Sequence, residues 1–111
     1  MVAPLKLAAA PISWGVSETP GWGIQLDPDR VLQDMLDLDI RYTEFGPAGF
    51  LPETADERAA YLNSKGMKAI GGFYPIVLHK EDHDPFPALE EELAAFEASG
   101  ATVLVLSVDT G

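Results

Sequence analysis

The sequence predicts an α/β fold built on a parallel sheet, with the element order β-α-β-α-β-α-β. Short apolar runs alternate with longer segments in which the apolar residues have helical spacing. The elements start again at steps of about thirty residues, which is the size of one βα unit. Because strands separated by helices pair in parallel through right-handed crossovers, we expect a single parallel sheet.

The first unit is predicted to contain a strand, a loop and a helix. The apolar run Leu5 to Ile12 predicts the strand, and a loop with glycine and proline follows from Glu18 to Asp27. Asp27 and Pro28 mark the helix start, because Asp is a favoured N-cap and Pro suits the first helical position. The apolar stripe of this helix is expected to comprise Val31, Leu32, Met35, Leu36 and Leu38.

The second unit begins with the strand-like run Tyr42 to Phe45, and Gly46 and Pro47 mark the end of this strand. Thr54 and Glu57 fit a capping box, in which the Thr hydroxyl accepts from the Glu amide and the Glu side chain bonds back. Gly66 lies where a helix ends and a residue with positive φ is needed.

The third unit starts with an apolar run whose first half, Ala69 to Phe73, predicts a strand, and Tyr74 to Asp84 is expected to form a loop. The pair Gly71-Gly72 lacks the spacing of a phosphate-binding fingerprint, so it predicts close packing or a bulge. Pro87 is expected to open the third helix.

In this third helix, Leu89, Leu93 and Phe96 share one apolar face, and Glu90 to Glu92 predict a solvated face. Gly100 repeats the role of Gly66 at the helix end. The last run, Thr102 to Val108, consists mostly of Val and Leu, which predicts a strand covered on both faces.

The chain of 111 residues is expected to be a single partial domain, 1–111. Its most apolar predicted strand comes last, with no helix after it, and an unprotected sheet edge is a liability. We therefore expect either the N-terminal half of a larger βα domain, completed by a C-terminal half, or a chain that self-associates.

Composition excludes several classes of function. The 18 acidic and 7 basic residues give a formal net charge of -11, which disfavours nucleic acid and anionic membrane surfaces. The absence of cysteine excludes disulfides and thiol chemistry. Met1 to Trp14 has a short apolar stretch after Lys6, but it continues as structured sequence rather than as a signal peptide, so we expect a cytoplasmic protein.

Three segments resemble a known family. They are Ala10-Pro11-Ile12-Ser13-Trp14-Gly15, Tyr42-Thr43-Glu44-Phe45-Gly46-Pro47 with Gly49-Phe50-Leu51-Pro52, and Gly66-Met67-Lys68. Together they are similar to the opening of the xylose isomerase-like TIM-barrel superfamily, in the branch of inosose dehydratases and sugar-phosphate isomerases and epimerases. The resemblance implies that the chain forms the first three βα units and the fourth strand, the N-terminal half of a (β/α)8 barrel.

The resemblance also implies a divalent-metal enzyme that isomerises, epimerises or dehydrates small sugars, polyols or keto-inositols. Members use a Mn, Co, Mg or Zn ion that acidifies a C–H bond, and a general base then removes the proton. The metal ligands belong to later strands, so none is placed on this sequence. We expect this chain alone to bind no metal and to be inactive.

In such a barrel the functional groups lie at the carboxyl ends of strands and in the loops after them. This rule selects Glu44 as a candidate catalytic or hydroxyl-binding residue, because a carboxylate inside an apolar strand needs a partner. The alternative is a structural ion pair with Arg41 or a lysine. With strand alternation, Tyr42 and Glu44 share one face, and Thr43 and Phe45 share the other. The same rule selects four candidate substrate-binding residues: Trp14, Phe50, His79 and Lys80.

Trp14, His79 and Lys80 also have structural interpretations. The Trp14 indole suits the C–H face of a polyol but equally well plugs a barrel mouth. His79 and Lys80 contact substrate or lie in a plain solvated loop. His79 and His83 have the i, i+4 spacing of metal ligands, but their segment is loop-like, so we assign no metal site.

Two functions from different classes remain open. One is the fragment of a metal-dependent sugar or inositol enzyme, and the other is a non-catalytic half-barrel module that self-associates. A Rossmann-type nucleotide binder is a third, weaker alternative, because Trp14-Gly15-Val16-Ser17-Glu18 lacks the glycine-rich turn that opens a helix.

Overall fold

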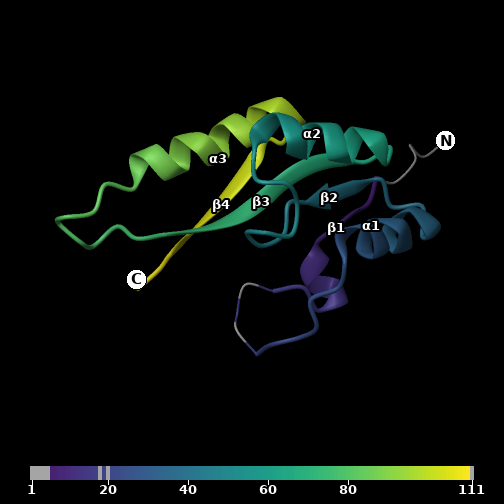
Figure 1. Cartoon of the computed structure of the whole chain (residues 1–111), viewed down its shortest axis with the longest axis horizontal. Coiled ribbons are helices and arrows are strands. Elements are labelled where there is room, and N and C mark those ends of the chain that lie inside the picture. Colours follow the sequence, from purple (N-terminus) through teal and green to yellow (C-terminus); the bar gives the residue numbers. More distant parts are fainter. Residues whose placement is uncertain (1–5, 18, 20, 111) are drawn as a thin grey trace.

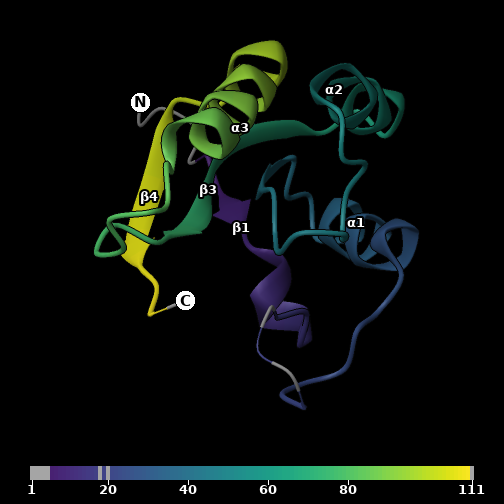
Figure 2. The ribbon, with the colours of Figure 1, turned by 60° about the vertical axis from the view of Figure 1, so that its left-hand side comes forward.

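A computed structural model describes residues 6–17, 19 and 21–110 of the chain. The elements in chain order are β1 (Ala8–Ala9), the 3-10 helix η1 (Pro11–Trp14), α1 (Pro28–Asp37), β2 (Tyr42–Glu44), α2 (Ala55–Ser64), β3 (Lys68–Ile76), α3 (Phe86–Ser99) and β4 (Val103–Val108). Their strands form one sheet in the order β1-β2-β3-β4, and all neighbours are parallel. The helices follow one another along one side of the sheet, with α2 and α3 next to each other (Figures 1 and 2). The predicted α/β fold is confirmed, and the arrangement is consistent with half of a (β/α)8 barrel.

The first strand is much shorter than the sequence predicted. Among the described residues, Ala8 and Ala9 alone pair with β2, and Pro11 opens η1 instead of continuing the strand to Ile12. The physical reason is that the Pro11 ring fixes φ near the helical value, and β2 itself offers few residues for pairing. The predicted strand start, Leu5, and the predicted loop start, Glu18, lie outside the described residues.

Helix α1 begins as predicted. The Asp27 carboxylate accepts a hydrogen bond from the Asp29 amide at 2.9 Å, and Pro28 occupies the first helical position. Val31, Leu32 and Met35 are fully buried, which confirms the core of the predicted stripe. Leu38 was wrongly placed on that stripe: it caps the helix and is 65% exposed, since the chain leaves the helix there.

The second unit confirms the Thr54 half of its capping box and the glycine at the helix end, but the described residues form no return bond from the Thr54 amide to the Glu57 side chain. Thr54 Oγ1 accepts from the Glu57 amide at 3.3 Å, and Gly66 takes a φ of 72° just after α2. Thr43 and Phe45 are buried while Tyr42 and Glu44 are half-buried, so the predicted alternation of the strand is confirmed.

Strand β3 continues three residues beyond the predicted end. Tyr74, Pro75 and Ile76 were predicted as loop but pair in register with Leu106, Ser107 and Val108. Proline is tolerated because β2 has already ended at Glu44, opposite Gly71, so this part of β3 has a neighbour on the β4 side alone within the described sheet.

The third helix begins one residue before Pro87, at Phe86, whose amide donates to the Asp84 carboxylate at 3.0 Å. Phe96 is buried as predicted. The prediction for Leu93 was wrong: it is 45% exposed, because the buried face of α3 carries Ala95 and Phe96 and Leu93 lies to one side of that face. Glu92 also departs from the predicted solvated face, because it is half-buried and pairs with Arg58.

Strand β4 begins at Val103 and is not covered on both faces as predicted. Val103 and Val108 are 58% and 69% exposed. Leu104 packs against the core. However, β4 is the edge strand of the described sheet, so no described strand pairs with the side of β4 that faces away from β3.

The hydrophobic core lies between the sheet and the helices. Its buried members are Val16, Val31, Leu32, Met35, Phe45, Phe50, Leu51, Leu62, Met67, Ala69, Ala95 and Phe96. Among the helices that the structure describes, none has the length and apolar character needed to cross a bilayer.

Candidate functional site

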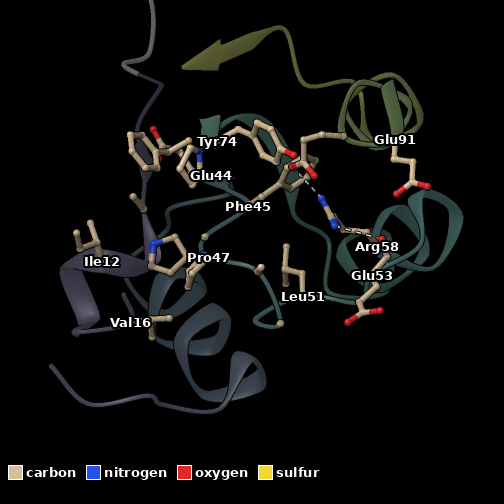
Figure 3. A pocket seen from close by; sticks show the side chains of 18 residues that line it. Ile12, Val16, Glu44, Phe45, Pro47, Leu51, Glu53, Arg58, Tyr74 and Glu91 are labelled. Atoms are coloured by element: carbon tan, nitrogen blue, oxygen red, sulfur yellow. Dashed lines mark hydrogen bonds and ion pairs between the residues drawn. The ribbon is translucent and has the colours of Figure 1, made fainter. Parts of the chain in front are cut away.

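A pocket of about 640 Å³ opens at the carboxyl ends of the first three strands. Its walls come from the residues that follow β1, from the end of β2 and the loop after it, from Phe73 to Pro75 of β3, and from α2 and α3. Ile12, Val16 and Pro47 lie on one side, and Arg58, Glu53 and Glu91 lie on the other (Figure 3). Ligands of open parallel sheets bind at this end of the strands, so the pocket is the candidate site.

Glu44 is the predicted candidate that lines this pocket. It is half-buried at the end of β2, on the strand face opposite Thr43. The alternative ion pair does not form among the described residues: Arg41 pairs with Asp39 at 3.3 Å, and no lysine pairs with Glu44. Among the described residues no side chain donates a hydrogen bond to the Glu44 carboxylate, which leaves both oxygens available to a ligand.

A shift of register between β2 and β3 determines where Glu44 lies. Thr43 is opposite Ala69, but the next residue, Glu44, is opposite Gly71, so Ile70 is the extra residue of a bulge. A Cβ on Gly71 would lie 2.3 Å from the Val103 carbonyl oxygen, which explains the glycine at this position. The prediction of close packing at Gly71-Gly72 is therefore confirmed, and the bulge lies directly before this pair, at Ile70.

The opposite wall is organised around Arg58 of α2. Its side chain is only 13% exposed, and its guanidinium pairs with Glu92 of α3 at 3.3 Å. The same guanidinium stacks 4.7 Å from the centre of the Phe45 ring, and that ring meets Phe96 edge-on at 4.9 Å. These contacts join the end of β2 to both helices of this wall.

The other predicted residues do not line this pocket. Trp14 packs against the core, and its indole Nε1 donates to Asp34 of α1 at 3.2 Å. Phe50 is a buried core residue beside a second, smaller hollow near the start of α1. His79 and Lys80 are exposed in the connection between β3 and α3. The structure therefore does not bring these four residues together with Glu44, and their roles in binding stay predictions.

Among the described residues, no group of three or more His, Asp or Glu side chains lies close enough together to hold a metal ion. His79 and His83 are both exposed in their loop. The donor set on these residues does not fit a complete metal centre.

Two residues of the pocket wall, Tyr74 and Arg58, were not predicted from the sequence. Tyr74 was assigned to a loop, although the continued pairing of β3 places it in the pocket wall. Arg58 is not part of any recognisable sequence motif, and its ion-pair partner, Glu92, is 34 residues away in the sequence. The available signal was that Arg58 is the basic residue in a helical turn that otherwise carries Asp56 and Glu57.

One network lies outside the pocket and joins α1 to α2. The Tyr61 hydroxyl donates to the Asp29 carboxylate, and Lys65 Nζ lies 3.0 Å from the same carboxylate. The hydrogen bond from Tyr61 and the contact with Lys65 lower the pKa of Asp29. Burial and the bond to Asp29 raise the pKa of Tyr61.

No protein-family model matches the chain. The sequence is 30% identical over 97 residues to an inosose dehydratase from Geobacillus kaustophilus (strain HTA426). The aligned region covers 87% of this chain and 29% of that relative, so the chain spans less than one third of the relative's length. The similarity therefore extends over most of this chain.

Proposed function

We propose that the chain is the N-terminal part of a sugar-modifying enzyme, an isomerase, epimerase or dehydratase that acts on a small sugar, polyol or keto-inositol. The observation that carries the proposal is the pocket at the carboxyl ends of the strands, with the unpaired carboxylate of Glu44 in its wall. The similarity to an inosose dehydratase supports the substrate class.

The pocket walls suit such a ligand. A polyol carries hydroxyl donors around a ring whose faces are C–H groups. Glu44 accepts hydrogen bonds from the hydroxyls, and a carboxylate makes these bonds stronger than a neutral acceptor does. The rings of Phe73 and Tyr74 and the apolar side chain of Ile12 offer surfaces for the C–H faces.

We propose that any divalent ion used by the complete enzyme takes its ligands from polypeptide outside the described residues. Four carboxylates of the described residues line the pocket, but no three His, Asp or Glu side chains of these residues lie close enough together to hold an ion, and a catalytic metal centre needs about three protein ligands. The contribution of this chain is then to bind and orient the substrate, and no chemical step is assigned to it.

We also propose what covers the exposed part of the sheet. Phe73 of β3 and Val105 of β4 are in register, and they are 43% and 47% exposed. The matched relative is more than three times as long as the region of similarity, since that region is 29% of it. Further βα units of the same chain would bury these residues as the interior of a closed barrel.

Titration of the chain with myo-inositol tests the binding role. We expect saturable chemical-shift changes at the amides of Glu44 and Tyr74, and an affinity at least about tenfold weaker in Glu44→Gln, because a hydrogen bond to a charged acceptor is lost. Glu97→Gln is the matched control, since Glu97 is exposed on α3 and does not line the pocket. Absence of binding to the unaltered chain, or equal weakening in both variants, would contradict the proposal.

The second candidate function is a non-catalytic module that self-associates, and the exposed apolar residues of β4 favour it. Sedimentation equilibrium separates the two candidates. A defined dimer that fails to bind myo-inositol supports the module, whereas a chain that binds myo-inositol as a monomer supports the enzyme fragment.

A further inference from the structure

We infer that Arg58 is a positioning residue: its side chain holds the 46–53 loop and the Phe45 ring in place, and these two parts form one wall of the pocket. The effect of Arg58 on the loop is independent of the ligand, whereas its effect on binding rests on the proposed function.

The guanidinium contacts four partners from three parts of the chain: the end of the 46–53 loop, α3 and the residue after β2. Its Nε donates to the Pro52 carbonyl oxygen at 2.9 Å, and one terminal nitrogen donates to the Glu53 carbonyl oxygen at 3.3 Å. The other terminal nitrogen donates to Glu92 at 3.3 Å, and the planar group stacks over Phe45 (Figure 3).

This geometry requires arginine rather than a cation in general. The guanidinium presents five N–H donors in a fixed fork and a flat face that stacks on an aromatic ring. A lysine ammonium is a point charge, so it can keep the pair with Glu92 but cannot also reach two carbonyl groups and cover the ring. Glu92 is 21% exposed and neutralises the charge, which makes burial of the guanidinium tolerable.

The contacts act on the pocket because the loop and the ring are parts of its wall. Phe45, Leu51 and Glu53 all line the pocket, together with Glu91 and Glu92 of α3. Within the loop itself, the Phe50 amide donates to the Pro47 carbonyl at 3.1 Å, which closes one turn. Loss of Arg58 would free the two loop carbonyls and separate the loop from α3, while the wall formed by β1 and β3 would keep its own contacts.

The experiment compares Arg58→Met and Arg58→Lys with two controls in the full chain. Arg41→Met removes an exposed arginine whose pair with Asp39 lies on the surface. Met67→Val weakens the core just before β3, at the strand end opposite to the pocket. Amide hydrogen exchange is measured at Phe50 and along β3, and the affinity for myo-inositol is measured in parallel.

We expect Phe50 in Arg58→Met to exchange about tenfold faster or more relative to the β3 amides, because the loop loses its anchor. Arg58→Lys should fall between this variant and the unaltered chain. Arg41→Met should change neither site, and Met67→Val should speed exchange at both sites alike. Across the variants, the affinity for myo-inositol should fall in proportion to the loss of exchange protection at the Phe50 amide, and it should not follow the melting temperature.

Equal acceleration at Phe50 and in β3 in Arg58→Met would overturn the inference, because it would show a merely structural role. Unchanged affinity despite a loosened loop would also overturn it. If the unaltered chain does not bind myo-inositol, the proposed function fails while the exchange result still decides the role of Arg58 in the loop. If Arg58→Met does not fold, the comparison of Arg58→Lys with Met67→Val decides it by the same criteria.

Discussion

Replacement of Gly71 by alanine is a sharp test of how β3 packs against β4. A Cβ at Gly71 would lie 2.3 Å from the Val103 carbonyl oxygen, far inside contact distance. At the adjacent Gly72 a Cβ would instead meet the Phe96 and Phe45 rings at 3.2 and 3.3 Å. A backbone carbonyl that takes part in strand packing cannot move by an ångström, whereas an aromatic ring can move by a few tenths.

The expected magnitudes follow from these contacts. Alanine in place of glycine reduces the entropy of the unfolded chain, which favours folding by about 0.4–1 kcal/mol. Overpacking opposes it by about 1–3 kcal/mol, and the backbone contact at Gly71 places this variant at the upper end. We expect Gly71→Ala to lose about 2 kcal/mol of unfolding free energy. Gly72→Ala should lie within about 1 kcal/mol of the unaltered chain.

Urea unfolding followed by circular dichroism measures both variants. For a domain of this size, each kcal/mol corresponds to a melting-temperature shift of about 4–8 °C, so thermal melting gives a second reading. A Gly71→Ala chain as stable as the original, or a Gly72→Ala chain that is the less stable of the two, would refute the reasoning about the β3–β4 contact.

Two further predictions concern α1. The Tyr61 hydroxyl and Lys65 lower the pKa of Asp29, so the ionised carboxylate stabilises the fold above the ordinary value of 3.8 and this contribution is lost as the pH falls through the lowered pKa. Asp29→Asn should therefore melt at a lower temperature than the original near neutral pH, and the difference in melting temperature should vanish in acid; a constant difference would contradict this. Trp14→Phe loses the hydrogen bond to Asp34 and should lose about 1 kcal/mol of unfolding free energy in urea titration, while the same change at the other tryptophan, which is more exposed, should have little effect.

Local chemistry was predictable from the sequence. The N-caps at Asp27 and Thr54 and the positive φ of Gly66 depend on residues within one helical turn, so a short stretch of sequence determines them. The parallel sheet followed from the alternation of elements in the same way.

Features that depend on distant partners could not be predicted. The end of β3 is determined by β4, which pairs with Tyr74 and Pro75 although proline argues against a strand. The exposure of Leu93 depends on which face of α3 packs against the rest of the fold, and helical spacing alone does not determine that. For the site, strand alternation located Glu44, but the Arg58–Glu92 pair joins two helices that the sequence alone does not place next to each other.

The order of strands in the sheet is the same as their order along the chain. Every strand therefore pairs with one that is a single βα unit away, and no described pairing has to wait for a remote segment. Contact order is correspondingly low for a β-containing chain, which favours fast folding. During synthesis each unit can dock on the edge left by the unit before it, so the pocket wall of β1 and β2 can form before α3 has left the ribosome.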